Sequence, residues 1–242
     1  MPAKLYAMTL SHPSQAVRIA LERKGIEHRV VALLPGFHPA MLRAAGFRGN
    51  TVPALKIDGR KSQHSVEIMR LLEETAPDPP LYPADPVQRQ AVEEAEEWGE
   101  RELQPIPRRA FRWSVWHNPE LRVWLARETG LPAPRLVAPM NKPLAIYFAR
   151  QIGADDAGIR SDMSRLPGLI DHVDELIADG VIGGPEPNAA DLQIGTTLRV
   201  LLEFEDLRNQ VEHRPAGQLA RRILPDYPGP IASSLPKDWL PA

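Results

Sequence analysis

The hydrophobic and polar positions in the first third of the chain predict short strands that alternate with helices. Residues 15–25 place apolar side chains at positions 16, 17, 20 and 21, which fall on one face of a helix. A strand-helix-strand unit crosses over right-handedly, so we expect parallel strands on either side of this helix. The expected elements are a strand at 3–8, the helix at 15–25, a strand at 28–34, an antiparallel hairpin at 54–57 and 60–63, and a helix from Ser65 that ends before Pro77.

Beyond residue 86 the pattern changes to helices, and no convincing pair of strands follows. Asn188 is a good N-cap residue with a carboxylate at Asp191, and the apolar run after them predicts a buried central helix. Pro105 and Pro107 are expected to interrupt or kink the chain. Helices are expected at 87–103, 108–116, 120–128, 144–152, 154–179 and from 189 onward. Loops are expected at 131–143 and in the proline-containing tail from 225, and 35–50 is expected to be a loop with room for one helical turn.

Five prolines between residues 77 and 86 mark the expected domain boundary, because so stiff a segment fits neither a helix nor a central strand. We therefore expect an α/β domain at 1–77, a linker at 78–86 and an all-helical domain at 87–242. The chain of 242 residues is long enough for two such domains.

Composition narrows the function classes. Hydrophobic residues at 43% and charged residues at 25% are typical of a globular protein, and the net charge of −2 gives no reason to expect a nucleic acid or an anionic membrane as partner. The beginning of the chain has no apolar signal core, so we expect a cytoplasmic protein. Because there is no cysteine, disulfides, thiolate metal sites and attack by the protein's own thiol are excluded, and the seven histidines show no metal-ligand spacing.

Val52-Pro53 is the most informative step in the chain. A proline inside an apparent strand gives no amide hydrogen to a sheet, so it belongs at the strand's first residue, at an edge or at a bulge. The backbone groups of Val52 are then free to pair with something else. A cis bond at this position is one hypothesis, since an X-Pro bond in cis costs only about 0.5–1 kcal/mol, and a trans edge proline is the other.

The turn from Ser11 to Ser14 lies at the start of the first helix, where amide groups and the helix dipole favour negative charge. Ser11 is either a functional hydroxyl or a simple N-cap, and Ser14 is the second candidate. We expect His12 and His38 to be exposed loop histidines. Trp113 and Trp116, which alternate with arginines, fit a core or a pocket wall better than a surface for nucleic acid.

Three features in this order resemble the cytosolic glutathione transferase family. They are the segment Leu10-Ser11-His12-Pro13-Ser14 after the first strand, Thr51-Val52-Pro53-Ala54-Leu55 with Ser65 opening the next helix, and Asn188 to Asp191 before an apolar helix. The resemblance implies a thioredoxin-like domain followed by an all-helical domain, which is the architecture that the pattern predicts.

The resemblance also implies roles for residues. Ser11, placed like the serine of theta-type members, would hydrogen-bond the thiol of bound glutathione. Val52 would pair through its backbone with the thiol-bearing residue, and Pro53 would be the cis proline. The residues expected to bind the thiol cosubstrate are Ser14, Thr51, Val52, Pro53, His64 and Ser65, and those expected to line an apolar substrate pocket are Phe37, Trp113, Trp116 and Tyr147.

One position departs from the family's pattern. Family members usually carry an acidic residue before the helix-opening serine, whereas His64 stands there in this chain, and Glu67 lies two residues beyond Ser65. The expected cosubstrate is therefore glutathione or another low-molecular-weight thiol. Three functions follow: thiol transfer to a small apolar electrophile, non-catalytic binding of ligands or partners, and reduction of a disulfide or peroxide through the bound thiol. A homodimer is implied by the resemblance.

Overall fold

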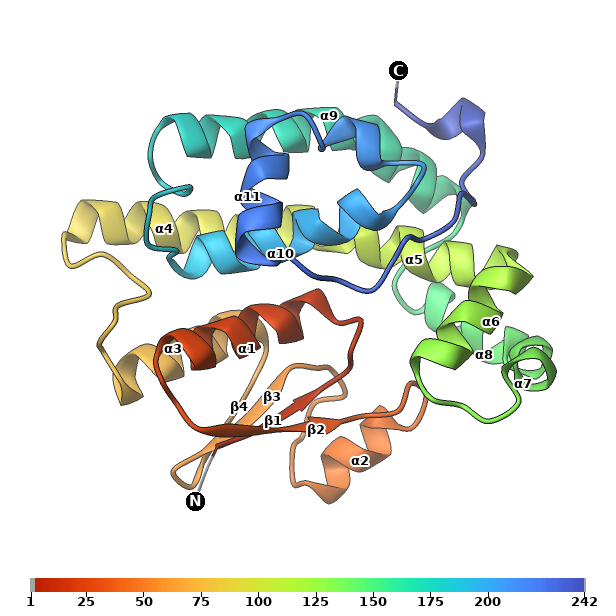
Figure 1. Cartoon of the computed structure of the whole chain (residues 1–242), viewed down its shortest axis with the longest axis horizontal. Helices are drawn as coiled ribbons and strands as arrows, with labels where there is room; N and C mark the ends of the chain where they lie inside the picture. Colours follow the sequence, from red (N-terminus) through yellow and green to blue (C-terminus); the bar gives the residue numbers. More distant parts are fainter. Residues whose placement is uncertain (1–2, 242) are drawn as a thin grey trace.

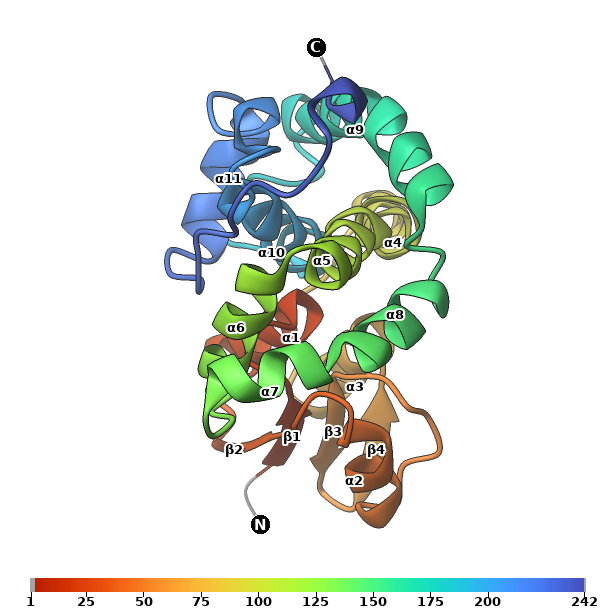
Figure 2. The ribbon, with the colours of Figure 1, turned by 90° about the vertical axis from the view of Figure 1, so that its right-hand side faces the viewer.

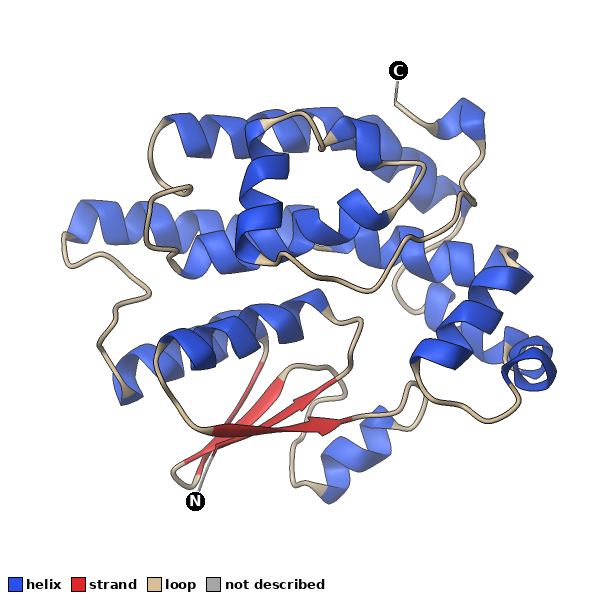
Figure 3. Cartoon of the chain, viewed as in Figure 1, coloured by secondary structure: helices blue, strands red, loops and turns tan. Residues whose placement is uncertain are grey.

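Residues 3–241 are described by a computed structural model, in which a small sheet lies beneath a layer of helices (Figure 1; Figure 3). The strands are β1 (Ala3–Ala7), β2 (His28–Ala32), β3 (Ala54–Ile57) and β4 (Arg60–Gln63). The helices are α1 (His12–Arg23), α2 (His38–Ala44), α3 (Ser65–Thr75), α4 (Pro86–Trp98), α5 (Pro105–His117), α6 (Pro119–Glu128), α7 (Pro134–Met140), α8 (Lys142–Arg150), α9 (Asp156–Ala178), α10 (Ala189–Glu203) and α11 (Pro215–Ile223), with a π-helical stretch at Gly99–Leu103 and short 3-10 turns at Arg208–Gln210 and Lys237–Trp239.

The sheet has the strand order β2-β1-β3-β4, and only the β1–β2 pair is parallel. Leu5 at the centre of β1 pairs with Val30 on one side and with Leu55 on the other. Helices α1 and α3 lie on the face of the sheet that points toward the helical layer, and α2 lies on the opposite face (Figure 1). The predicted thioredoxin-like domain followed by helices is confirmed.

Helix α1 joins the two halves of the molecule. Its apolar side chains at 16, 17, 20 and 21 are fully buried, as their spacing predicts. They belong to one large core that runs from the sheet through α1 and α3 to α10. A smaller core of Leu33, Leu42, Phe47 and Ala54 holds α2 against the other face of the sheet.

The segment between α3 and α4 is tied to the first domain by Lys24. Its ammonium group is fully buried and donates to the Glu73 carboxylate at 2.8 Å and to the carbonyls of Ala76 and Pro79 at 2.5 and 3.0 Å. Three acceptors satisfy the three donors of the lysine, so the buried charge is compensated. The linker predicted at 78–86 lies in this segment, and the exact domain bounds stay a prediction.

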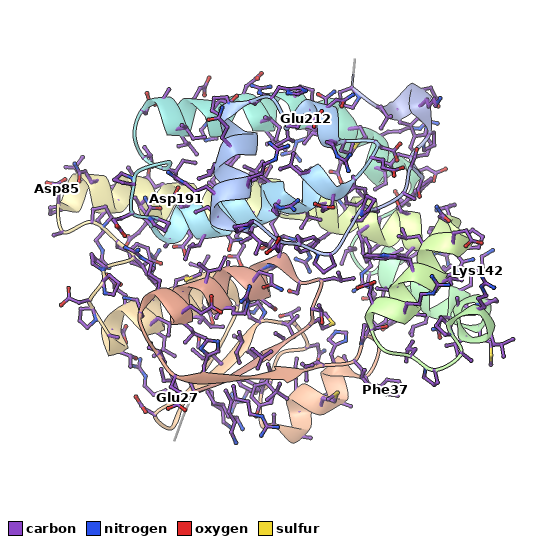
Figure 4. All side chains as sticks on the ribbon, viewed as in Figure 1. Glu27, Phe37, Asp85, Lys142, Asp191 and Glu212 are labelled. Atoms are coloured by element: carbon purple, nitrogen blue, oxygen red, sulfur yellow. The ribbon has the colours of Figure 1, made fainter. Side chains whose placement is uncertain are left out.

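Helix α10 is the buried helix predicted for the second half, with Asn188 and Asp191 forming the predicted capping box. Asp191 is fully buried and accepts from the amides of Asn188 at 3.0 Å and Gly183 at 2.7 Å. Figure 4 labels it at the start of α10, beside the loop that follows α9. The cap therefore fixes both the helix and the preceding loop.

Three expectations about secondary structure differ from the structure. Pro105 and Pro107 do not interrupt the helical path, because the π-helical stretch Gly99–Leu103 joins α4 to α5 without a loop. Both prolines lie in the first turn of α5, where proline is tolerated. Proline likewise opens α7, inside the segment expected to be a loop. The segment 35–50, expected to be a loop with room for one helical turn, contains the whole of α2. Helix α11 lies before the tail, in a segment for which the pattern predicts no element.

Candidate functional site

A cleft of about 710 Å³ lies where the end of the sheet meets the helical layer. Figure 2 shows α6, α7 and α8 in front of this end of the sheet. The lining side chains come from four parts of the chain: the turn before α1, the loop from β2 into α2, the segment before β3, and helices α5, α6 and α8 with part of the tail. These segments are distant in sequence, so the cleft exists only in the folded molecule.

Ser11 lies at the mouth of α1 and lines this cleft. Its hydroxyl oxygen accepts from the Ser14 hydroxyl at 2.9 Å and from the Ser14 amide at 3.4 Å. Ser11 is therefore the N-cap of α1, which was one of the two roles considered for this serine. Because both bonds use the oxygen as acceptor, its hydroxyl hydrogen is left to donate into the cleft.

Thr51 and Val52 also line the cleft. The Thr51 carbonyl accepts from the Gln63 side chain at 3.2 Å, which fixes the segment before β3. Among the described residues, neither the amide nor the carbonyl of Val52 takes part in a hydrogen bond. The Val52-Pro53 bond is cis, as one of the two hypotheses held, and Pro53 precedes the first residue of β3.

The remaining residues expected to bind the cosubstrate lie around the cleft and do not line it. Ser14 is buried and points to Ser11. Ser65 opens α3 and is 1% exposed, and its hydroxyl has no hydrogen-bond partner among the described residues. His64 precedes it with a left-handed backbone (φ 69°).

Glu100 is a carboxylate near His64 that sequence reasoning missed. Burial raises the pKa of Glu100 and is the largest influence on it. The charge of Glu67 also raises this pKa, whereas the charges of His64 and Arg108 lower it. Glu100 comes from the π-helical stretch of the second domain. An acidic group is therefore present close to the position where the sequence has a histidine.

His12 is buried, contrary to the expectation of an exposed loop histidine. Only 4% of it is exposed, because α10 covers the start of α1. Its Nδ1 atom lies 3.1 Å from the hydroxyl of Thr197, and that hydroxyl donates to the Gln193 carbonyl. Nδ1 therefore carries the proton, and Nε2 has no partner among the described residues. Burial, aided by the charge of Arg108, lowers the pKa of His12 to about 3.

His38, at the first position of α2, is also buried and lines the cleft. Its ring centroid lies 6.0 Å from that of Phe148 on α8. Burial and then the charge of Arg112 lower the pKa of His38. Both histidines next to the cleft are thus held in the neutral form by the same two causes.

Arg108 and Arg112 project into the cleft from successive turns of α5. The guanidinium of Arg112 stacks on Phe148 at 5.2 Å. Burial and the charge of Arg108 together lower the pKa of Arg112 to about 10. Neither arginine lies within 4 Å of a carboxylate among the described residues. The cleft therefore carries two guanidinium charges without an ion-pair partner.

Of the four residues expected to line an apolar pocket, the structure brings only Tyr147 to the cleft. Trp113 is buried in the helical domain, where its indole donates to Asp156 and its ring stacks on His117. Trp116 lies against the same histidine, and Phe37 is 66% exposed (labelled in Figure 4). The aromatic wall is built by Phe111, Trp124 and Phe148.

Phe111 and Trp113 show why the pattern alone does not tell which aromatic side chains of α5 line the cleft. The two residues are two positions apart, so they point from different faces of α5. Phe111 shares the cleft-facing side with Arg108 and Arg112, which recur at helical spacing. That recurrence was visible in the sequence, but which face meets the cleft depends on how α5 packs.

Tyr227 reaches the cleft from the tail. Its hydroxyl donates to the Leu10 carbonyl at 2.7 Å, directly before Ser11. Burial raises the pKa of Tyr227 well above its ordinary value, and the charge of Glu203 raises it further, so the phenol stays protonated. The tail therefore fixes the backbone that carries Ser11.

Metal-binding clusters and membrane-spanning helices are both absent from residues 3–241. No group of three or more histidine, cysteine or acidic side chains there could hold a metal ion. No helix in that range combines the length and the apolar character needed to cross a membrane.

Comparison with known proteins gives a match in the first domain. A family model for the N-terminal domain of glutathione S-transferase matches residues 5–80. Maleylacetoacetate isomerase of Mus musculus is 40% identical over 99 residues, covering 36% of this chain and 43% of the relative. The enzyme of Rattus norvegicus is 39% identical over 92 residues, with the same coverage. The chain thus spans less than half the length of these curated relatives.

Solved structures match over nearly the whole chain. A glutathione S-transferase from Rhodospirillum rubrum has a TM-score of 0.61 at 20% identity and covers 91% of this chain, with 87% of its own length matched. Poplar glutathione transferase F1 reaches 0.64 at 17% identity, covering 92% of each chain. A Methylobacterium radiotolerans glutathione S-transferase in complex with glutathione sulfonate reaches 0.52 at 20% identity, covering 92% of this chain and 90% of its own. At these identities the likeness shows the fold.

Proposed function

We propose that this chain is a member of the glutathione transferase family, that it binds glutathione or a similar thiol in the cleft, and that it activates this thiol for attack on a small electrophile. The match of residues 5–80 to the family model and the cleft geometry support the proposal. The single observation that carries it is that the Ser11 hydroxyl and the backbone of Val52, which makes no hydrogen bond among the described residues, line the same cleft.

Ser11 would stabilise the ionised sulfur. Ser14 donates to the Ser11 oxygen, which polarises the Ser11 hydroxyl toward a bound sulfur. A hydrogen bond to a charged group contributes about 1.5–3 kcal/mol. That energy lowers a free thiol pKa of about 8.5 by about one to two units. The thiol proton passes to solvent, and the thiolate is the nucleophile.

The Val52 amide and carbonyl would align the cosubstrate as an extra strand at this edge. At the other end of the cosubstrate, the α3 N-terminus with Ser65 would receive a carboxylate, and Glu100 would replace the missing acidic residue at position 64 for an ammonium group. The Ser65 hydroxyl, which has no partner among the described residues, and the effect of the His64 charge on the pKa of Glu100 support this assignment.

The test is calorimetric titration with glutathione, and with cysteine as a second thiol, together with the ultraviolet absorbance of the bound thiolate as pH is varied. Ser11→Ala is expected to raise the bound thiol pKa by about one to two units and to lower kcat/KM by about tenfold to a hundredfold. Glu100→Gln is expected to weaken glutathione binding by about tenfold, with exposed Glu94→Gln as the matched control.

Binding without a change in the thiol pKa in Ser11→Ala would refute the catalytic role of Ser11. No binding of either thiol would favour the second candidate, a non-catalytic binding protein. The observation that favours that candidate is His64 in place of the acidic residue.

A further inference from the structure

The cleft holds an unbalanced positive charge. Among its described lining residues Arg108 and Arg112 are basic and Glu128 is the single acidic one, and no ion pair joins Glu128 to either arginine. Glu100 does not line the cleft, and its charge raises the pKa of Arg108 but not that of Arg112. Like charges one helical turn apart repel, and a partly desolvated charge without a partner destabilises the fold.

The neighbouring polar groups do not relieve this charge. His12 and His38 face it as neutral rings, and residues 3–241 supply no carboxylate within ion-pair distance of either guanidinium. The aromatic wall adds cation–π contact, as between Arg112 and Phe148, which holds the guanidinium in place and leaves its edge donors unused. An arrangement of this kind is complementary to an anion.

We propose that the electrophile taken by this cleft is a small unsaturated or aromatic carboxylate, whose carboxylate Arg108 and Arg112 bind while its planar body lies against Phe111, Trp124 and Phe148. This inference rests on the proposed thiol transfer and adds the substrate class. The planar fork of a guanidinium matches the two oxygens of a carboxylate, and flat rings match an unsaturated body.

The two reactants, the thiol and the electrophile, are then held by different domains. Ser11 in the first domain would hold the sulfur, and α5 in the second would hold the electrophile. For a chloromethyl substrate the thiolate sulfur forms a bond to the methylene carbon, and the carbon–chlorine bond breaks. Chloride leaves with the bonding pair, so no oxidant or reductant is needed.

The experiment compares 4-(chloromethyl)benzoate with its neutral methyl ester as cosubstrates of glutathione, each corrected for the uncatalysed rate. The unmodified protein is expected to prefer the carboxylate by about tenfold to a hundredfold in kcat/KM. In Arg112→Gln and in Arg108→Gln the preference is expected to fall toward one, while Arg112→Lys retains part of it. Exposed Arg127→Gln on α6 is the control for net charge, since it does not line the cleft.

A second measurement needs no thiol. The unreactive 4-methylbenzoate is expected to raise the thermal unfolding midpoint of the unmodified protein and of Arg127→Gln, and not that of the double variant Arg108→Gln/Arg112→Gln. Circular dichroism establishes that each variant is folded. If no thiol binds but this stabilisation is present and lost in the double variant, the proposed transferase function fails and the carboxylate site stands.

Two outcomes would overturn the inference. An active protein that converts the ester as well as the carboxylate would show that the arginines do not select the electrophile. A loss of glutathione affinity in the arginine variants as large as the loss for the carboxylate probe would show that the pair binds the tripeptide's own carboxylates.

Discussion

His12 is a buried, neutral base directly beside the serine proposed to act on the thiol. Its Nδ1–H is used by Thr197, whereas Nε2 keeps a free lone pair. Because burial and Arg108 lower its pKa to about 3, it carries no charge at neutral pH. His12 therefore leaves the positive field of the cleft to the two arginines.

The pH dependence of folding follows from that lowered pKa. An unfolded histidine has a pKa near 6.5, so between about 6.5 and 3 the unfolded chain binds the extra proton. His12 thus contributes stability that is present above pH 6.5 and is lost as pH falls toward 3. We expect His12→Gln, which keeps a donor for Thr197, to flatten this fall in the free energy of unfolding.

Urea unfolding at a series of pH values between 4 and 7 measures the effect, at about 1.36 kcal/mol for each unit of pKa difference. His213→Gln is the control, because the side chain of His213 is 84% exposed. Equal slopes in the unmodified protein and in His12→Gln would contradict a neutral buried imidazole.

The cap of α10 is the feature with the largest expected effect on stability at the scale of an element. Asp191 is fully buried and accepts from two backbone amides, those of Gly183 and Asn188. Without the carboxylate both amides, which belong to half-buried residues, lose their partner. Arg222, 3.8 Å away, would lose its charge partner as well.

We expect Asp191→Ala to lower the free energy of unfolding by about 2–4 kcal/mol. The control is Asp85→Ala at the cap of α4, where an exposed carboxylate accepts from the Val87 and Gln88 amides. Figure 4 labels both aspartates. The loss at Asp85 should be about 0.5–2 kcal/mol. Equal losses at the two sites would show that burial of the cap does not matter.

Proline-rich segments show where sequence reasoning about elements succeeds and fails. Prolines at the beginning of α1, α4 and α5 all lie in first turns, where helix geometry tolerates them. The segment 131–143 looked like a loop because it contains several prolines, yet α7 and α8 each begin with one in their first turn. Counting prolines is therefore less informative than asking which turn of a helix each one opens.

At the scale of the whole molecule, the tail controls the position of Ser11. Tyr227 donates to the carbonyl of Leu10 across 217 positions of sequence. This bond ties the turn that carries Ser11 to the tail of the second domain. The geometry proposed for thiol activation thus depends on a residue far outside the first domain.

Tyr227→Phe removes this bond and keeps the ring. We expect kcat/KM for thiol conjugation to fall by about twofold to tenfold and the bound thiol pKa to rise, as the Ser11 turn loosens. Tyr6→Phe is the matched control, because the Tyr6 ring packs on Phe47 and does not line the cleft. An unchanged thiol pKa in Tyr227→Phe would show that the turn is rigid without the tail.

The sequence by itself determined the features that depend on neighbouring residues. Apolar spacing placed α1 and α10, the Val52-Pro53 step marked the start of β3, and Asn188 with Asp191 marked a helix start. Helix periods and turn preferences act within a few residues, so a local pattern is enough to predict them. Ser11 at the start of α1 was identified for the same reason.

Only the tertiary structure decided what surrounds that serine. The burial of His12 and His38 and the choice of Phe111 over Trp113 for the cleft wall depend on how the second domain packs on the first. The same holds for Arg108 and Arg112, which have no ion-pair partner among the described residues. Thr197 meets His12 across 185 positions of sequence. Desolvation and charge interactions act through space, so the electrostatics of the cleft are a property of the packed molecule.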